Sequence, residues 1–106
     1  MTMLARYFTA TASPENAPRY YAFFRDTLTP QLKQLPGHRG ALVMSHARVD
    51  IVEILVLTFW DSAEAIRGFA GETPDVAVVE PEAREILASF DTHITTYTVE
   101  FESVLR

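Results

Sequence analysis

The segment IVEILVLTFW, residues 51–60, decides the fold expected of this chain. Its β-branched and aromatic residues predict a strand, but polar and apolar residues do not alternate along it. Successive side chains of a strand point to opposite faces, so both faces of this strand are apolar. One face is expected to carry Ile51, Leu55, Leu57 and Phe59, and the other Val52, Ile54, Val56 and Trp60. In a chain of 106 residues, its own helices can cover only one face of such a sheet. The other face needs a partner, and we expect a homodimer joined through the sheet face.

Turn residues divide the first half of the chain into alternating strands and helices. Residues 3–11 predict a strand, because they are rich in aromatic and β-branched side chains. Apolar residues then recur at helical spacing over residues 17–35, and the Pro-Gly pair that follows ends this helix. Pro30 lies inside the helix and should kink it, because proline donates no backbone hydrogen bond. Residues 38–48 and 50–60 are expected to form the second and third strands.

The second half of the chain predicts helices followed by one more strand. Asp61 and the glutamate three residues later match a capping box before a short helix. Proline follows Thr73 and again Glu80, so we expect a helix to start at each. Residues 91–102 alternate between two faces and predict the fourth strand. The order of elements is that of an α+β, ferredoxin-like βαββαβ domain over residues 1–106, an antiparallel four-stranded sheet with helices on one face.

Composition and charge narrow the classes of function. Nine Lys and Arg face fourteen Asp and Glu, for a net charge of −5, and no basic run occurs. We therefore expect no nucleic-acid partner. Apolar runs such as residues 54–57 are too short to span a membrane, and the first residues do not resemble a signal peptide. A soluble cytoplasmic protein without a membrane role is expected.

No local sequence motif indicates a particular reaction. The chain has no cysteine, and its histidines, His38, His46 and His93, fit no metal-binding spacing, so no metal site is predicted. Nucleotide-binding glycine motifs and nucleophile motifs are absent as well. Any catalysis must therefore use dispersed residues that converge from different elements.

Three stretches carry a resemblance to a known family: TFWDSAEAIRGFAG at 58–71, AVVEPEAREIL at 77–87 and FDTHITTYTV at 90–99. They resemble the antibiotic biosynthesis monooxygenase family, with the Trp60-Asp61 pair and the Phe69-Ala70-Gly71 turn as the most specific parts. The resemblance implies a small dimeric α+β barrel of ferredoxin-like fold. The wider superfamily includes quinone-forming oxygenases that need no cofactor, haem-degrading enzymes, isomerases and proteins without an assigned activity.

Two departures from relatives bear on the reaction. Relatives commonly carry a histidine immediately before the tyrosine of the last strand, where this chain has Thr96 before Tyr97. Haem-degrading relatives carry an asparagine on the first strand and a histidine on a helix. This chain has Arg6 near the asparagine place and no histidine in residues 76–89, so no axial haem ligand is expected.

The resemblance implies a cofactor-independent monooxygenase that acts on a small aromatic or polyketide-like compound. Its pocket would have Phe24, Trp60 and Phe69 as the hydrophobic wall, Arg6 facing a developing oxyanion, and His46 or Tyr97 transferring a proton. A non-catalytic dimeric module that binds a hydrophobic metabolite is one alternative. An isomerase or lyase of the same superfamily is the other, because proton transfer needs the same parts.

The same residues also have purely structural interpretations. Arg6 shares its strand face with apolar residues, so it could sit in a buried ion pair with Glu53 or Glu100. Trp60 could simply pack in the core. His46 shares a face with Leu42 and Met44 and could lie at the dimer interface, and His38 reads as an exposed turn residue. A ligand site should show a cavity of about 300 Å³ or more.

Overall fold

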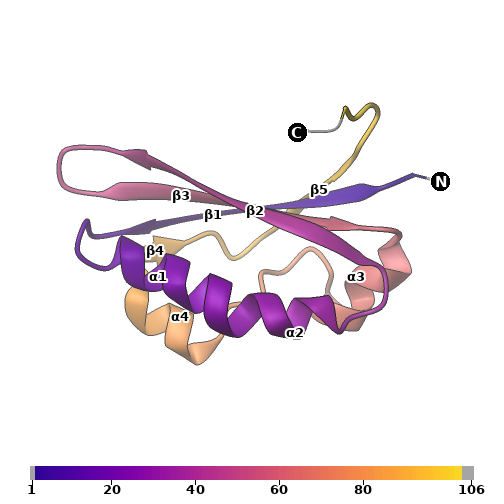
Figure 1. Cartoon of the computed structure of the whole chain (residues 1–106), viewed down its shortest axis with the longest axis horizontal. Coiled ribbons are helices and arrows are strands. Elements are labelled where there is room, and N and C mark those ends of the chain that lie inside the picture. The colour runs from indigo at the N-terminus through magenta and orange to yellow at the C-terminus, as the bar shows by residue number, and fades with distance from the viewer. Residues whose placement is uncertain (1, 104–106) are drawn as a thin grey trace.

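The helices lie on one face of an antiparallel sheet in the computed structural model of this chain, which describes residues 2–103 (Figure 1). The elements in chain order are β1 (Leu4–Ala12), α1 (Ala17–Phe23), the π-helical turn η1 (Phe24–Leu28), α2 (Thr29–Lys33), β2 (His38–Ala47), β3 (Val52–Trp60), α3 (Ala63–Ala70), α4 (Pro81–Ile86), β4 (Ser89–Phe90) and β5 (Thr95–Thr98). None of the helices within residues 2–103 has the length and apolar character needed to cross a membrane.

The sheet confirms the expected βαββαβ arrangement. Its strands run in the order β2-β3-β1-β4, with β5 also paired to β1, and all the pairings are antiparallel. The last strand is therefore split into two pieces, β4 and β5, that pair with different parts of β1.

The prediction of one continuous strand over residues 91–102 is wrong. The N–H of Asp91 still donates to the Thr9 carbonyl at 3.0 Å, but the chain then turns toward the segment before α4. The N–H of Ile94 donates to the Asp75 carbonyl at 2.8 Å, and the N–H of Ala77 donates to the Thr92 carbonyl at 2.9 Å. Because the backbone groups of residues 92–94 hydrogen-bond to that segment, pairing with β1 resumes only at β5.

The first helix passes through Pro30 by changing its hydrogen-bonding pattern. Pro30 has no N–H to donate to a carbonyl of the preceding turn. The chain widens into η1, and both the backbone N–H and the hydroxyl of Thr29 donate to the Phe24 carbonyl. A π-helical turn between α1 and α2 thus stands where we expected a kink.

Two of the predicted helix starts need correction. The cap of α3 is Ser62, whose hydroxyl accepts a hydrogen bond from the Ala65 N–H at 3.1 Å, whereas Asp61 pairs with Arg39 at 3.1 Å. No helix follows Thr73, because that segment bends to make the backbone pairing with residues 92–94. The start at Glu80 is confirmed, and α4 begins there with proline in its first turn.

The two faces of the sheet differ in how they are covered. On the helix face, buried side chains such as Ala10, Ile54, Val56 and Trp60 pack against the helices. The opposite face, here called the open face, has no helix of residues 2–103 over it (Figure 1). Its large side chains are Tyr7, Leu42, Met44, Leu55, Leu57, Phe59 and Tyr97. Leu42, Met44 and Tyr97 are 36%, 41% and 53% exposed, so this face is apolar and uncovered, as the third strand's sequence predicted.

Gly37 makes the turn between the first helix and β2, and its replacement tests the close packing there. Gly37 has φ +83°, and a Cβ on it would lie 2.5 Å from the Ala65 Cβ. We expect Gly37→Ala to lower the free energy of unfolding by about 2–5 kcal/mol, because strain and overpacking add. Chemical denaturation measures this loss.

Gly68→Ala is the matched control for that variant. Gly68 lies inside α3, and no heavy atom lies within 4 Å of the position of an added Cβ. We expect Gly68→Ala to stabilise the protein by up to ~1 kcal/mol, because alanine favours helix. Equal stability of the two variants would contradict the packing described at Gly37.

Candidate functional site

Arg6 lies in the middle of the helix face, on β1 between Thr58 of β3 and Thr96 of β5. The residue is only 4% exposed. One terminal nitrogen, Nη2, donates to the backbone carbonyls of Pro74 and Val76, at 2.9 and 3.2 Å. The guanidinium carbon also lies 5.6 Å from the centre of the Phe69 ring, within the range of a cation–π contact.

The buried ion pair considered for Arg6 does not form. No carboxylate in residues 2–103 lies within salt-bridge distance of Arg6. Glu53 instead pairs with Arg48 at 3.1 Å, where both side chains are exposed, and Glu100 forms no ion pair with Arg6. The Nε of Arg6 is buried and has no hydrogen-bond partner in this part of the chain. Burial lowers the pKa of Arg6, which shows that its charge is held in an environment that disfavours it.

A small cavity, here called the Arg6 cavity, lies between the sheet and the helices. Its volume is about 40 Å³, room for about three water molecules rather than an aromatic ring. This is far below the ~300 Å³ expected of a ligand site. Its walls are formed by Arg6, Phe8, Tyr20, Phe24, Leu28, Leu32, Val56, Thr58, Phe69, Val78, Val79, Glu80, Ala83, Leu87 and Ile94.

The three aromatic residues expected to form a pocket wall lie at different depths. Phe24 and Phe69 line the Arg6 cavity. Trp60 is fully buried and lies behind Phe69, with the two rings stacked at a centroid distance of 5.6 Å. Its Nε1 donates to the Thr58 hydroxyl at 2.9 Å, so its one polar group is satisfied within the core. Trp60 therefore supports the wall without lining the cavity.

His46 and Tyr97 are on the open face, on the other side of the sheet from Arg6. His46 lies opposite Glu53 in the pairing of β2 with β3, and Tyr97 makes an edge-on contact with Tyr7, at 6.0 Å between ring centres. The structure thus separates the residues predicted for proton transfer from the one predicted for the oxyanion. Arg6 and His46 each share a face with the residues expected from their own strands. The sequence alone did not show that these are opposite faces of the sheet.

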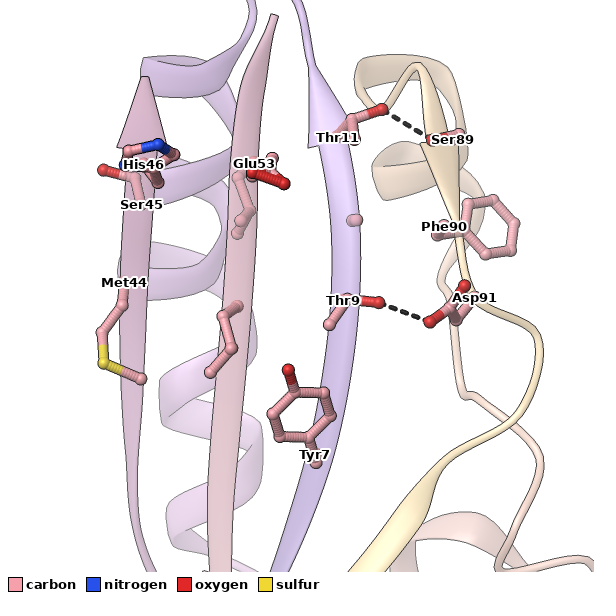
Figure 2. A pocket seen from close by; sticks show the side chains of 13 residues that line it. Tyr7, Thr9, Thr11, Met44, Ser45, His46, Glu53, Ser89, Phe90 and Asp91 are labelled. Atoms are coloured by element: carbon pink, nitrogen blue, oxygen red, sulfur yellow. Dashed lines mark hydrogen bonds between the residues drawn. The ribbon is translucent and has the colours of Figure 1, made fainter. Parts of the chain in front are cut away.

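The end of the open face near His46 is a shallow groove lined by both apolar and polar side chains (Figure 2). Its volume is about 510 Å³. The hydroxyl of Thr9 donates to the Asp91 carboxylate, and the hydroxyls of Thr11 and Ser89 are 2.6 Å apart (Figure 2). These polar side chains bond to one another across β1 and β4, while the neighbouring Met44 leaves the groove partly apolar.

Comparison with solved structures places this arrangement in a known fold. A provisionally named antibiotic biosynthesis monooxygenase from Bacillus cereus matches with a TM-score of 0.63 at 17% identity, over 98% of this chain and 99% of that one. A protein of the same provisional name from Chloroflexus aurantiacus matches with a TM-score of 0.62 at 16% identity, over 98% of this chain and 99% of that one. This chain has the fold of the antibiotic biosynthesis monooxygenase structures.

A third solved structure of this monooxygenase fold contains a ligand. It is a monooxygenase from Streptomyces coelicolor in complex with nanaomycin D, and it matches with a TM-score of 0.54 at 14% identity, over 99% of this chain and 91% of that one. Neither a scan against protein-family models nor a search of curated proteins finds a match. At these identities the likeness establishes the monooxygenase fold, and the reaction has to be argued from the residues of this chain.

Two further polar residues, Tyr20 and Glu80, line the Arg6 cavity. Tyr20 is 4% exposed, and Glu80 is half-buried. Burial, and secondarily the charge of Glu80, raises the pKa of Tyr20 far above its usual value, and burial also raises the pKa of Glu80. The sequence allows Tyr20 as a polar group of a ligand pocket but favours it no more than the other tyrosines, and Glu80 matches a solvated helix start. No feature of the sequence indicates that Tyr20 and Glu80 line the same cavity as Arg6.

His38 also departs from its expected place. Rather than an exposed turn residue, it is half-buried, with its ring edge-on to Trp60 at a centroid distance of 4.9 Å. Its Nδ1 is buried without a hydrogen-bond partner among the described residues, and burial lowers the pKa of His38. Within residues 2–103, no group of three or more His, Asp or Glu side chains could hold a metal ion.

Proposed function

We propose that this chain is a cofactor-independent monooxygenase that oxidises a small planar phenolic compound of the polyketide type in the Arg6 cavity. The observation that carries the proposal is the buried Arg6 guanidinium, whose partners are neutral carbonyls and an aromatic ring. Burying a charge without a counter-charge costs several kcal/mol. A bound phenolate or enolate oxygen would supply the missing negative charge.

The chemistry needs little from the protein beyond what these walls offer. A base removes an acidic hydrogen from the substrate, and the resulting carbanion itself reduces dioxygen. One oxygen atom enters the product as a quinone carbonyl and the other leaves as water, so the substrate supplies all the electrons. An arginine keeps its charge throughout, because the guanidinium does not deprotonate in proteins. It therefore stabilises the oxyanion from the start of the reaction to its end.

Ligand entry requires the Arg6 cavity to grow. Residues 71–80 lie outside the helices and strands, and they supply Val78 and Val79 to the wall. The same segment supplies the two carbonyls that hold Arg6. We infer that an aromatic ligand displaces this segment, and that its oxygen replaces those carbonyls on the guanidinium. The nanaomycin D complex of the Streptomyces neighbour supports a planar aromatic ligand as the type to test.

Dioxygen uptake with dithranol tests the proposal. Dithranol is a planar phenol with an acidic CH₂ group, and its oxidation to the anthraquinone consumes one dioxygen and releases one water. We expect the wild-type chain to accelerate uptake and Arg6→Gln to lower kcat by about 10²–10³-fold, the range for losing an oxyanion donor. Arg6→Lys keeps the charge but loses the planar fork, and we expect it to retain an intermediate rate.

Arg19→Gln is the matched control for charge loss. Arg19 is exposed on α1, where its Nη1 donates to the Asn16 side-chain oxygen at 3.1 Å. We expect it to leave the rate unchanged. Saturable binding of dithranol without dioxygen uptake would instead favour the non-catalytic binding module, and equal rates for Arg6→Gln and the control would overturn the role given to Arg6.

We also propose that a second copy of this chain covers the open face. The supporting observation is the row of apolar side chains on β2 and β3 that no helix of the chain covers. A two-fold dimer presents the same surface from both copies, so Leu42, Met44 and Leu57 of one protomer would meet the same residues of its partner. His46 and Tyr97 then belong to the interface rather than to the reaction.

A further inference from the structure

The wall of the Arg6 cavity contains a carboxyl group that the oxyanion role does not use. Glu80, immediately before α4, lines the cavity together with Arg6 and Tyr20. No Lys, Arg or His nitrogen of residues 2–103 lies within 4.0 Å of its carboxylate. Its side chain makes no capping bond to α4 either. The Glu80 carboxyl group is thus half-buried, and apart from a hydrogen bond with its own backbone N–H it has no charged partner in this part of the chain.

Among the titratable groups of this cavity, Glu80 alone can accept a proton near neutral pH. Arg6 is a permanent donor. Tyr20 stays protonated, because burial and the nearby Glu80 charge raise its pKa far above the usual value. The Thr58 hydroxyl accepts the Trp60 indole N–H at 2.9 Å and is not basic. His46 is on the open face and is separated from the cavity by the sheet.

Arg6 and Glu80 line one cavity without forming an ion pair. The cavity therefore has a positive end at Arg6 and a negative end at Glu80, and these two charges do not neutralise each other. A ligand with an acidic hydrogen near one end and an oxygen that takes up negative charge near the other satisfies both. Planar phenols with an acidic C–H or O–H in conjugation with a carbonyl have this pattern.

We propose that Glu80 is the base that removes the acidic hydrogen of the substrate. This inference rests on the proposed function and names the proton acceptor for it. The C–H or O–H bond of the substrate breaks, its proton moves to a carboxylate oxygen of Glu80, and its electron pair stays on the substrate as an enolate or phenolate facing Arg6. The step needs no oxidant, and dioxygen enters only afterwards.

The electrostatics of the site agree with this role. Burial raises the pKa of Glu80, and a base works best when its pKa lies near the operating pH. The proton-accepting carboxylate is present above that raised pKa and is lost as the pH falls through it. The rate of proton removal should therefore rise with pH, with a midpoint above the ordinary glutamate value of 4.5.

Deuterium exchange of the dithranol CH₂ group in D₂O, followed by proton NMR without oxygen, isolates this step from oxidation. We expect Glu80→Gln to slow the protein-catalysed exchange by about 10²–10⁴-fold and to abolish its dependence on pH. Glu80→Asp keeps the carboxylate at a shorter reach and should recover part of the rate. Glu82→Gln, an exposed position two residues along on α4, is the matched control and should exchange as the wild type does.

The outcomes separate the two proposals. Quenching of Trp60 fluorescence measures dithranol binding, which Glu80→Gln should retain. Loss of exchange with retained binding supports Glu80 as the base. Wild-type exchange that Glu80→Gln leaves unchanged overturns this inference alone, while wild-type dioxygen uptake would still support the monooxygenase. Absence of both exchange and uptake in the wild type overturns both.

Discussion

Trp60→Ala is expected to lower the free energy of unfolding by about 3–5 kcal/mol, the range for removing a large buried aromatic side chain. Trp60 is fully buried, stacks on Phe69 and contacts His38. Its loss leaves a cavity behind the wall that holds Arg6, and the Thr58 hydroxyl loses its donor. We therefore expect the melting temperature to fall sharply and Phe69 to lose its support.

Two further variants are compared with Trp60→Ala: one keeps an aromatic ring at this position, and the other is an exposed control. Trp60→Phe keeps a ring in the stack, so we expect it to lose clearly less stability than Trp60→Ala. Val49→Ala, at a position 93% exposed between β2 and β3, should change the free energy of unfolding by less than ~0.5 kcal/mol. Calorimetry on the three variants checks the order, and a Trp60→Ala loss no larger than that of Val49→Ala would contradict this packing.

Leu57→Glu is expected to convert the proposed dimer to a monomer. Leu57 lies on β3 at the centre of the open face, opposite Leu42 on β2 and Tyr7 on β1. A carboxylate there would be buried without a partner in both protomers, which costs about 3–5 kcal/mol. We therefore expect the dimer dissociation constant to rise by about 10²–10³-fold or more.

Sedimentation equilibrium measures that change. Val49→Glu adds the same charge at the exposed turn between β2 and β3 and should leave the dissociation constant unchanged. The monomeric variant should also expose the open face to hydrophobic dyes. A wild-type chain that is monomeric at all concentrations, or a Leu57→Glu variant that associates as tightly as wild type, would show that a second copy does not cover this face.

The fold was predictable because local patterns and global arrangement agree. The doubly apolar third strand, the helical spacing over residues 17–35 and the proline at the start of α4 each predicted what the structure contains. The errors arose where a segment's backbone is used by a distant one. Polar and apolar residues alternate over residues 91–102 as in a strand, yet residues 92–94 pair with the segment after Thr73. The sequence pattern of neither segment indicates this pairing.

The candidate site was only half predictable for a related reason. Strand parity correctly placed Arg6 among inward-facing residues and His46 beside Met44. The alternation of side chains shows which residues of one strand share a face. It does not show which residues of a neighbouring strand lie on that same face, because this depends on the pairing register. Arg6 and His46 were therefore joined in one pocket when the sheet separates them. Glu80 was missed because a glutamate before a proline matches a solvated helix start, and only tertiary packing places it in the wall of the Arg6 cavity.

The crystal structure of this chain with nanaomycin D most directly tests the claim that the Arg6 cavity is the reaction site. We predict the ligand between the sheet and the helices, with a ligand oxygen bonded to Arg6 in place of the Pro74 and Val76 carbonyls, and Glu80 in the same enlarged cavity. A ligand bound in the groove beside His46 instead, with Arg6 still held by both carbonyls, would contradict the account.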